Sequence, residues 1–312
     1  MAVGGKVTFE DGVPTQRVAC PALCVAAEPT DSERVRSCSI QIPVEHALDV
    51  HVGGKLMRIT CTPTHLIELI VGRLYTEGVI RSADDVDAVE ISDDMARARV
   101  MLVDEAPAAG EDVEVVPTYG VSGRPVPPEE RGVGLRPRDR RALEAWDVEQ
   151  VFELARTFAE DTPIHLATNG AHSCYLAVDG EIRWCCEDLG RHNALDKVIG
   201  SALLAGEDLS RAVVFSSGRI PADMAAKAIR AGIPMLVTKA VPTDLAVRMA
   251  REAGLVLICS ARPDSVKVFN DPTGTFSSAE AAMRDAVAAP CAEAEKCGGA
   301  AGVAPCVGGA RL

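Results

Sequence analysis

Charged and amide side chains crowd one short stretch of the chain, residues 187–197, which reads EDLGRHNALDK. Arg191, His192, Asn193 and Lys197 lie where an apolar helical pattern begins after a glycine. The first turn of a helix offers unpaired N–H groups and a partial positive charge, so this stretch could hold an anion. A solvated helix face has the same composition, and the stretch alone leaves both interpretations open.

Other turns place polar or basic groups after short apolar runs: SSGRIP with Ser217, Gly218 and Arg219, TKAVPTD with Lys239, and SARPDS with Arg262. In open α/β sheets, ligands bind outside the carboxyl ends of the strands. Arginine binds phosphate through a planar fork of N–H groups. We therefore predict that these turns converge around a polyphosphate. His172, in TNGAHSC, also follows a glycine turn, and both a structural and a ligand-binding role fit it.

The chain contains 11 cysteines, an odd number, and no C-x-x-C pair. Its first residues lack the apolar segment of a signal peptide, and no apolar run has the length of a transmembrane helix. We therefore expect a cytoplasmic protein with reduced cysteines that are buried, bind metal or react as thiols. Cys185 and Cys186 are neighbours on an expected strand, so at most one of them faces a given pocket.

The formal net charge of −13 disfavours nonspecific binding to nucleic acid or to an anionic membrane surface. The P-loop pattern, the dinucleotide-binding glycine pattern and the zinc deaminase signature are all missing from the sequence. We therefore expect no nucleic-acid partner, no membrane partner and no tightly held metal.

The elements that must position these turns follow from hydrophobic periodicity. The first half alternates at strand spacing and contains one helical stretch from Leu66, with Thr64 as its expected N-cap. We predict an N-terminal arm over 1–35, an α+β subdomain over 36–117 and an exposed loop over 118–145.

The second half alternates short apolar strands, among them IHLATNG, CYLAVDG and EIRWCCED, with helices. This rhythm predicts right-handed crossovers and a largely parallel sheet in an α/β domain over 146–275. Residues 276–312 are rich in alanine and glycine and contain Cys291, Cys297 and Cys306, which indicates a flexible tail.

Several of these segments, in order, resemble the FdhD/NarQ family of formate dehydrogenase accessory sulfurtransferases. They are TNGAHSC, EDLGRHNALDKVIG, SSGRIPADMAAKAIRAGIP and SARPDSVKVF in the second half, with VEHALDVHVGG and CTPTHLIELIVGRLYTEGVI in the first. The resemblance covers roughly residues 39–270, and EDLGRHNALDKVIG is its most specific part.

The resemblance implies a C-terminal three-layer domain of cytidine-deaminase-like fold without the zinc site. It also implies a cytoplasmic homodimer that carries persulfide sulfur from a cysteine desulfurase to a molybdenum or tungsten bis(molybdopterin guanine dinucleotide) cofactor. The client would be formate dehydrogenase or a related molybdopterin oxidoreductase. The basic turns would hold the guanine nucleotide, and the family's cofactor stretch falls on Ser260, Ala261, Arg262, Pro263, Asp264 and Ser265.

One motif of the family has changed. Where its members carry C-G-x-C-G before the second domain, this chain reads TYGVSG, with Tyr119 at the first cysteine position and Ser122 at the second. Neither a phenol nor an alcohol accepts a sulfane sulfur as a thiolate does. The usual sulfur-accepting pair is therefore missing.

Three hypotheses remain open at this point. The carrier cysteine has moved, to Cys174, Cys185, Cys186 or the tail cysteines; or the protein is a cofactor-binding chaperone without sulfurtransferase activity. A nucleotide hydrolase or deaminase, indicated by the fold alone, is the third.

Overall fold

A computed structural model describes residues 15–30, 33–103, 143, 146, 148–160, 162–274 and 276. The loop positions Tyr119 and Ser122 and the tail cysteines Cys291, Cys297 and Cys306 lie outside the described residues.

A six-stranded sheet forms the centre of the C-terminal domain, with the strand order β12-β11-β10-β9-β7-β8. Its three middle strands, β9, β10 and β11, are parallel, while β7, β8 and β12 run antiparallel to their neighbours. The strands are β7 His172–Val178, β8 Glu181–Asp188, β9 Ala212–Ser216, β10 Met235–Thr238, β11 Val256–Cys259 and β12 Lys267–Asn270. A short 3-10 helix, Leu209–Arg211, leads into β9.

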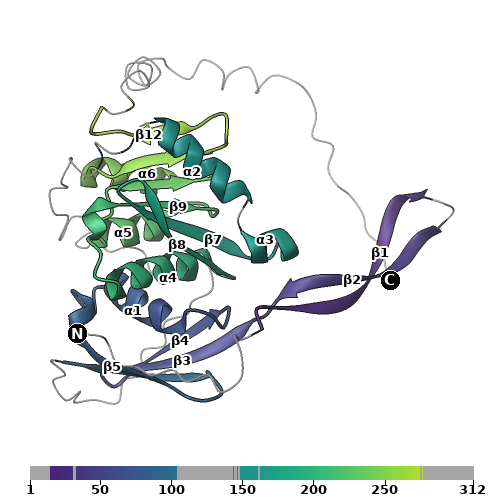
Figure 1. Ribbon diagram of the computed structural model, residues 1–312, viewed down its shortest axis with the longest axis horizontal. Coiled ribbons are helices and arrows are strands. Elements are labelled where there is room, and N and C mark those ends of the chain that lie inside the picture. Colours follow the sequence, from purple (N-terminus) through teal and green to yellow (C-terminus); the bar gives the residue numbers. More distant parts are fainter. Residues whose placement is uncertain are drawn as a thin grey trace, which may run out of the picture.

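Helices cover both faces of this sheet (Figure 1). The first face packs against α4 (Arg191–Leu204), α5 (Ala222–Arg230) and α6 (Asp244–Ala253). The second face packs against α2 (Val148–Glu160). The predicted three-layer α/β domain is therefore confirmed, with α5 and α6 as the crossovers that join the parallel strands. The prediction of a largely parallel sheet is wrong, because the pairs β7–β8, β7–β9 and β11–β12 are antiparallel.

The N-terminal subdomain is the predicted α+β unit. Its four-stranded sheet has the order β4-β3-β6-β5, and α1 (Leu66–Thr76) packs on it through a separate apolar core. The strands are β3 His46–Val52, β4 Lys55–Cys61, β5 Val86–Ile91 and β6 Arg97–Leu102, with a 3-10 turn at Ala83–Asp85.

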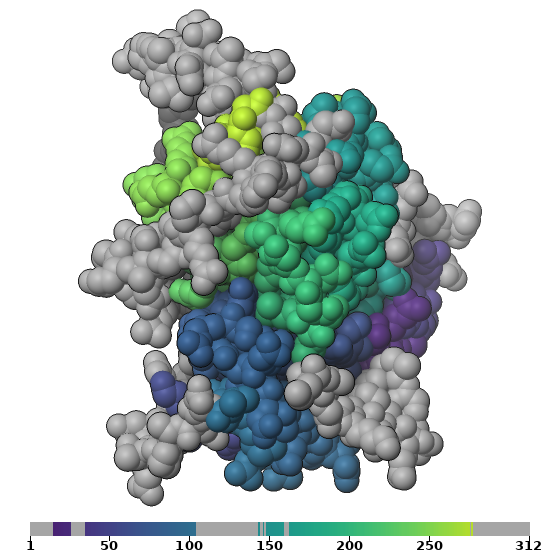
Figure 2. Space-filling view, turned by 60° about the vertical axis from the view of Figure 1, so that its left-hand side comes forward, coloured from purple at the N-terminus to yellow at the C-terminus, as the bar shows by residue number. Residues whose placement is uncertain are grey.

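Helices α1 and α4 join the two units at very short range. A Cβ atom placed on Gly72 would lie 1.9 Å from the Asp196 carbonyl oxygen, and one placed on Gly200 would lie 1.9 Å from that of Glu68. Only glycine permits this approach of two backbones. The space-filling view shows the blue N-terminal subdomain against the green part of the C-terminal domain (Figure 2).

A long β-hairpin, β1 (Arg17–Thr30) and β2 (Glu33–Pro43), projects sideways from this body (Figure 1). The predicted end of the N-terminal arm, at residue 35, falls inside β2. Cys24 and Cys38 form a disulfide across the hairpin, so the expectation that all cysteines are reduced is wrong for this pair. Strand pairing brings together two thiols that are 14 residues apart in sequence.

Two local predictions are also wrong. IHLATNG was expected to be a strand, but Pro163–Thr168 forms helix α3. The carboxylate of Glu187 accepts hydrogen bonds from the N–H groups of Ile164 and His165, at 2.7 and 2.8 Å, and so caps the helix from a distant strand. The N-cap of α1 is His65, not Thr64, and it has a left-handed φ of 51°.

Candidate functional site

The turns that follow β9, β10 and β11 lie side by side at one edge of the sheet. The Lys239 N–H donates to the Ser216 carbonyl at 3.1 Å, and the Ser260 N–H donates to the Ala240 carbonyl at 2.7 Å. The Ala261 N–H donates to the Thr238 carbonyl at 2.9 Å. Parallel strands end at the same edge, so three turns that are distant in sequence form one continuous surface.

Ser217 and Gly218 lie at the centre of this edge. The Ser217 hydroxyl accepts the Ser173 N–H at 3.0 Å and lies 3.2 Å from Nδ1 of His172. The Thr238 hydroxyl donates to the Gly218 carbonyl at 2.6 Å. A Cβ atom on Gly218 would lie 2.8 Å from Cδ of Arg191, so glycine here lets the arginine side chain cross the turn.

Arg191, the first residue of α4, is half-buried, and its Nε has no hydrogen-bond partner among the described residues. The N-cap residue of this helix is Gly190, which makes no side-chain capping hydrogen bond. Burial, helped by the nearby positive charge of Arg219 and opposed by Asp223, lowers the pKa of Arg191. A donor that is buried without an acceptor is costly, so this side chain is suited to receive an anion.

A second cationic pair lies on the neighbouring turns. Lys239 is half-buried, with Nζ 5.6 Å from the centre of the Phe158 ring. Burial and the charge of Arg262 lower the pKa of Lys239. The guanidinium of Arg262 donates to the Lys239 carbonyl at 2.6 Å, which attaches the last turn to the one before it. We call Arg191, Arg219, Lys239 and Arg262 the cationic edge.

The stretch 260–265 is a tight turn on the same edge. The Arg262 N–H donates to the Ser265 carbonyl at 2.7 Å, and the Ser265 hydroxyl donates to Asp264 at 3.3 Å. Ser260 has a left-handed φ of 50°. Ala261 is buried, whereas Arg262, Pro263, Asp264 and Ser265 are exposed. Cofactor binding by this stretch stays a prediction.

The two histidines of the predicted site take different positions. His172 is half-buried beside Ser217, and burial followed by the charge of Arg191 lowers its pKa. His192 is buried, with Nε2 2.9 Å from Asp223. Burial acts to raise the pKa of Asp223, but the hydrogen bond and charge of His192 outweigh it and lower that pKa.

Asn193 and Lys197 are not at the cationic edge, contrary to their predicted position. The Asn193 amide donates to the Thr60 carbonyl at 2.7 Å and to Asp188 at 2.9 Å. Lys197 is fully buried, with Nζ 2.7 Å from Asp188 and 2.8 Å from the Thr62 hydroxyl. Both side chains bind the C-terminal domain to the N-terminal subdomain, because their helix face is turned inward.

Two of the cysteines proposed as replacement carriers, Cys174 and Cys186, are buried and therefore poorly suited to sulfur transfer. Burial raises the pKa of Cys174 to about 12 and that of Cys186 to about 11. A thiol that is not ionised near neutral pH is a weak nucleophile. Cys185 is half-buried and packs beside the α2 side of the sheet.

The described residues include no group of three His, Cys, Asp or Glu side chains that could hold a metal ion. None of the helices in the described part of the chain is long and apolar enough to cross a membrane.

Comparison with known proteins relates most of the chain to a family. Residues 43–275 match the model of the FdhD/NarQ family. Relatives named "Sulfur carrier protein FdhD" include one from Listeria innocua, 28% identical over 73% of this chain and 89% of its own length. Another from Nocardia farcinica is 32% identical over 73% and 86%, and one from Sulfurisphaera tokodaii is 33% identical over 67% and 79%.

The fold is also that of a solved structure. A crystal structure described as that of a formate dehydrogenase accessory protein from Desulfotalea psychrophila matches with a TM-score of 0.66 at 22% identity. The match covers 83% of this chain and 98% of the other.

Proposed function

The chain belongs to the FdhD/NarQ family, and we propose that it is an accessory protein for the maturation of formate dehydrogenase or a related molybdopterin oxidoreductase. In this role it binds the bis(molybdopterin guanine dinucleotide) cofactor as cargo and carries sulfur to it from a cysteine desulfurase. We further propose that it acts in the cytoplasm as a homodimer. The names of its relatives support the accessory and sulfur-carrier parts of this proposal.

The cationic edge is the proposed guanine nucleotide site. The observation that carries this assignment is the convergence of Arg191, Arg219, Lys239 and Arg262 from four separate turns, with Arg191 Nε buried and unpartnered among the described residues. Neighbouring cations repel one another, and a bound diphosphate would relieve that repulsion. The two arginines at Gly218 would hold phosphate oxygens through their planar forks.

Sulfur transfer by this chain would need a cysteine elsewhere, because Tyr119 and Ser122 occupy the positions of the two cysteines in the family's C-G-x-C-G motif. A cofactor-binding chaperone without sulfur transfer is the second candidate function. The buried, weakly acidic thiols of Cys174 and Cys186 favour it. The two functions share the nucleotide site and differ only in whether a cysteine of this chain takes up sulfur.

Calorimetric titration with GDP tests the nucleotide site. We expect Arg191→Ala and Arg219→Ala each to weaken GDP binding by roughly tenfold or more, because a hydrogen bond to a charged group contributes about 1.5–3 kcal/mol. Arg183→Ala is the matched control, since this exposed arginine pairs with Glu181 at the far end of β8. If the intact protein does not bind GDP, or if the arginine variants bind as it does, the proposed site is wrong.

Incubation with a cysteine desulfurase and L-cysteine separates the two functions. A sulfur carrier gains the mass of one sulfur atom on a cysteine-containing peptide, and treatment with a reductant removes it. A chaperone without sulfur chemistry binds GDP, gains no sulfur and releases no sulfide.

A further inference from the structure

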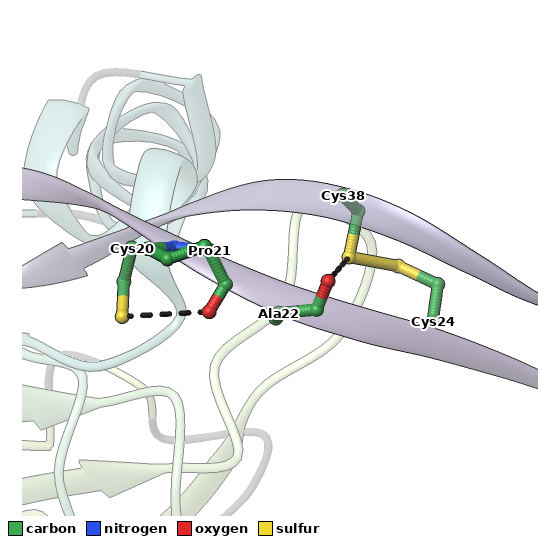
Figure 3. Close-up of a disulfide and its surroundings, with 5 residues drawn as sticks. All are labelled: Cys20, Pro21, Ala22, Cys24 and Cys38. Carbon is green, nitrogen blue, oxygen red and sulfur yellow. Dashed lines mark hydrogen bonds between the residues drawn. A yellow bond between two sulfur atoms is a disulfide. The ribbon is translucent and has the colours of Figure 1, made fainter.

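Three cysteines share one face of the projecting hairpin. In the ladder, Cys38 lies opposite Ala22, Cys24 opposite Arg36 and Cys20 opposite Ile40. Side chains alternate between the faces of a strand, so residues 20, 22 and 24 and their partners 40, 38 and 36 point to the same side. Figure 3 shows the disulfide between Cys24 and Cys38, with Cys20 separate from it along β1.

Other thiols of the described chain are less suited to react. Cys61, Cys174, Cys186 and Cys259 are buried in the cores, and burial raises their pKa values to about 12, 12, 11 and 12. The hairpin cysteines, in contrast, stand on a two-stranded ribbon outside those cores (Figure 1). Among the described cysteines, only Cys185 and those of the hairpin are not buried in a core, and Cys185 is half-buried against the second core.

The same face of the ribbon presents apolar side chains. Val18, Ile40 and Ile42 are 43%, 46% and 40% exposed, and all lie on the cysteine-bearing face. Apolar side chains around a reactive group give a protein donor a surface to pack against. The hairpin thus combines half-exposed cysteines with an apolar surface.

We propose that Cys24 and Cys38 are a sulfur-accepting and resolving pair whose substrate is a hydropersulfide. This inference rests on the proposed sulfur-carrier function, and it replaces the thiols missing at Tyr119 and Ser122. The pair starts as two thiols, which a dithiol reductant maintains.

The first step transfers one sulfur atom without net oxidation. A hairpin thiolate attacks the outer sulfur of the donor R–S–SH, the donor S–S bond breaks, and R–S⁻ leaves. The product is Cys–S–SH, and the proton of the persulfide moves with the transferred sulfur.

The second step releases that sulfur as sulfide. The other hairpin thiolate attacks the inner sulfur of Cys–S–SH, the Cys24–Cys38 bond forms, and HS⁻ leaves. The two cysteines are oxidised by two electrons, and the sulfane sulfur is reduced by the same two. A dithiol then reduces the disulfide and resets the pair. Cys24 and Cys38 form a disulfide with a Cα–Cα distance of 6.2 Å, within the ordinary range, so the backbone allows the bond that this step requires.

Peptide mass spectrometry and a sulfide assay test the proposal with reduced full-length protein and glutathione persulfide as the donor. We expect the unmodified protein to release sulfide and to form the Cys24–Cys38 disulfide. Cys24→Ser or Cys38→Ser should lose this sulfide release and retain a persulfide on the remaining hairpin cysteine, because no thiol resolves it. Cys20→Ser is the matched control and should behave as the unmodified protein, since Cys20 shares the face but not the disulfide.

The outcomes separate this proposal from the proposed function. If the hairpin peptides of Cys24→Ser and Cys38→Ser take up no sulfur while peptides with Cys291, Cys297 or Cys306 do, the hairpin pair is wrong and the sulfur-carrier function stands. If no cysteine of the protein or its variants takes up sulfur from either glutathione persulfide or a desulfurase, and no sulfide is released, both fail, and GDP binding then identifies a chaperone. Circular dichroism of each variant excludes loss of folding as the cause.

Discussion

His172 lies at the start of β7, within 3.2 Å of the Ser217 hydroxyl and close enough to Arg191 for its charge to act on the imidazole. Burial lowers the pKa of His172, helped by Arg191, His165 and His192 and opposed by Asp188. The side chain is therefore neutral at pH 7. A bound phosphate would oppose the field of Arg191 and favour the protonated imidazole.

We predict that GDP binding raises the pKa of His172 and takes up protons. Since the bound state holds the proton more tightly, His172 should strengthen GDP binding as the pH falls from 7 through its free pKa, which lies below 6.5. Calorimetry measures GDP binding by the protein and by His172→Asn across this pH range. The nucleotide titrates equally in both experiments, so the difference between the two pH profiles is the contribution of His172. Identical pH profiles for the two proteins would contradict the prediction.

At the scale of elements, the crossing of α1 and α4 decides how the two units meet. Gly200 has high conformational freedom, and alanine is a better helix former by about 1 kcal/mol. In an isolated helix Gly200→Ala would therefore stabilise. Here the added methyl group would meet the Glu68 carbonyl oxygen at 1.9 Å, so packing reverses the sign.

We expect Gly200→Ala to reduce the free energy of unfolding by about 1–3 kcal/mol or more, the usual cost of overpacking. Thermal denaturation measures the change. Ala205→Ser, exposed just after α4, is the control and should change stability little. A variant as stable as the parent would show that the two helices can separate without cost.

For the whole molecule, buried charge clusters bind the N-terminal subdomain to the C-terminal domain. Lys197 pairs with Asp188, and both are fully buried beside Thr62. Asp196, also buried, accepts from Lys227 at 2.8 Å and from the Thr76 hydroxyl at 2.7 Å. Breaking one member of a buried pair leaves an uncompensated charge, so these clusters are sensitive to single changes.

We predict that Lys197→Met destabilises the protein by about 3–5 kcal/mol, because Asp188 is left buried without its cation. Chemical denaturation measures the loss, and Lys55→Met, at an exposed position at the start of β4, is the control. GDP binding to the folded variant should persist, since Lys197 lies away from the cationic edge. A stability equal to that of Lys55→Met would refute this role for the lysine.

The sequence by itself determined the layered second domain and the cationic edge. Alternating strands and helices allow few topologies, and parallel strands must end at one edge, so Arg219, Lys239 and Arg262 could be placed together from their turns alone. The first turn of α4 added Arg191 for the same reason. The position of these turns could be predicted because hydrophobic periodicity and the order of strands and helices can be read directly from the sequence.

Only the tertiary structure decided which polar residues face inward. Lys197 and Asn193 belong to the same polar stretch as Arg191, yet their partners, Thr62 and Thr60, lie more than a hundred residues earlier, with separations of 135 and 133. Helix α3 depends likewise on Glu187, 23 residues after Ile164. The orientation of a polar side chain and the identity of its charged partner depend on packing between segments that are far apart in the sequence. A local sequence pattern carries no information about these contacts.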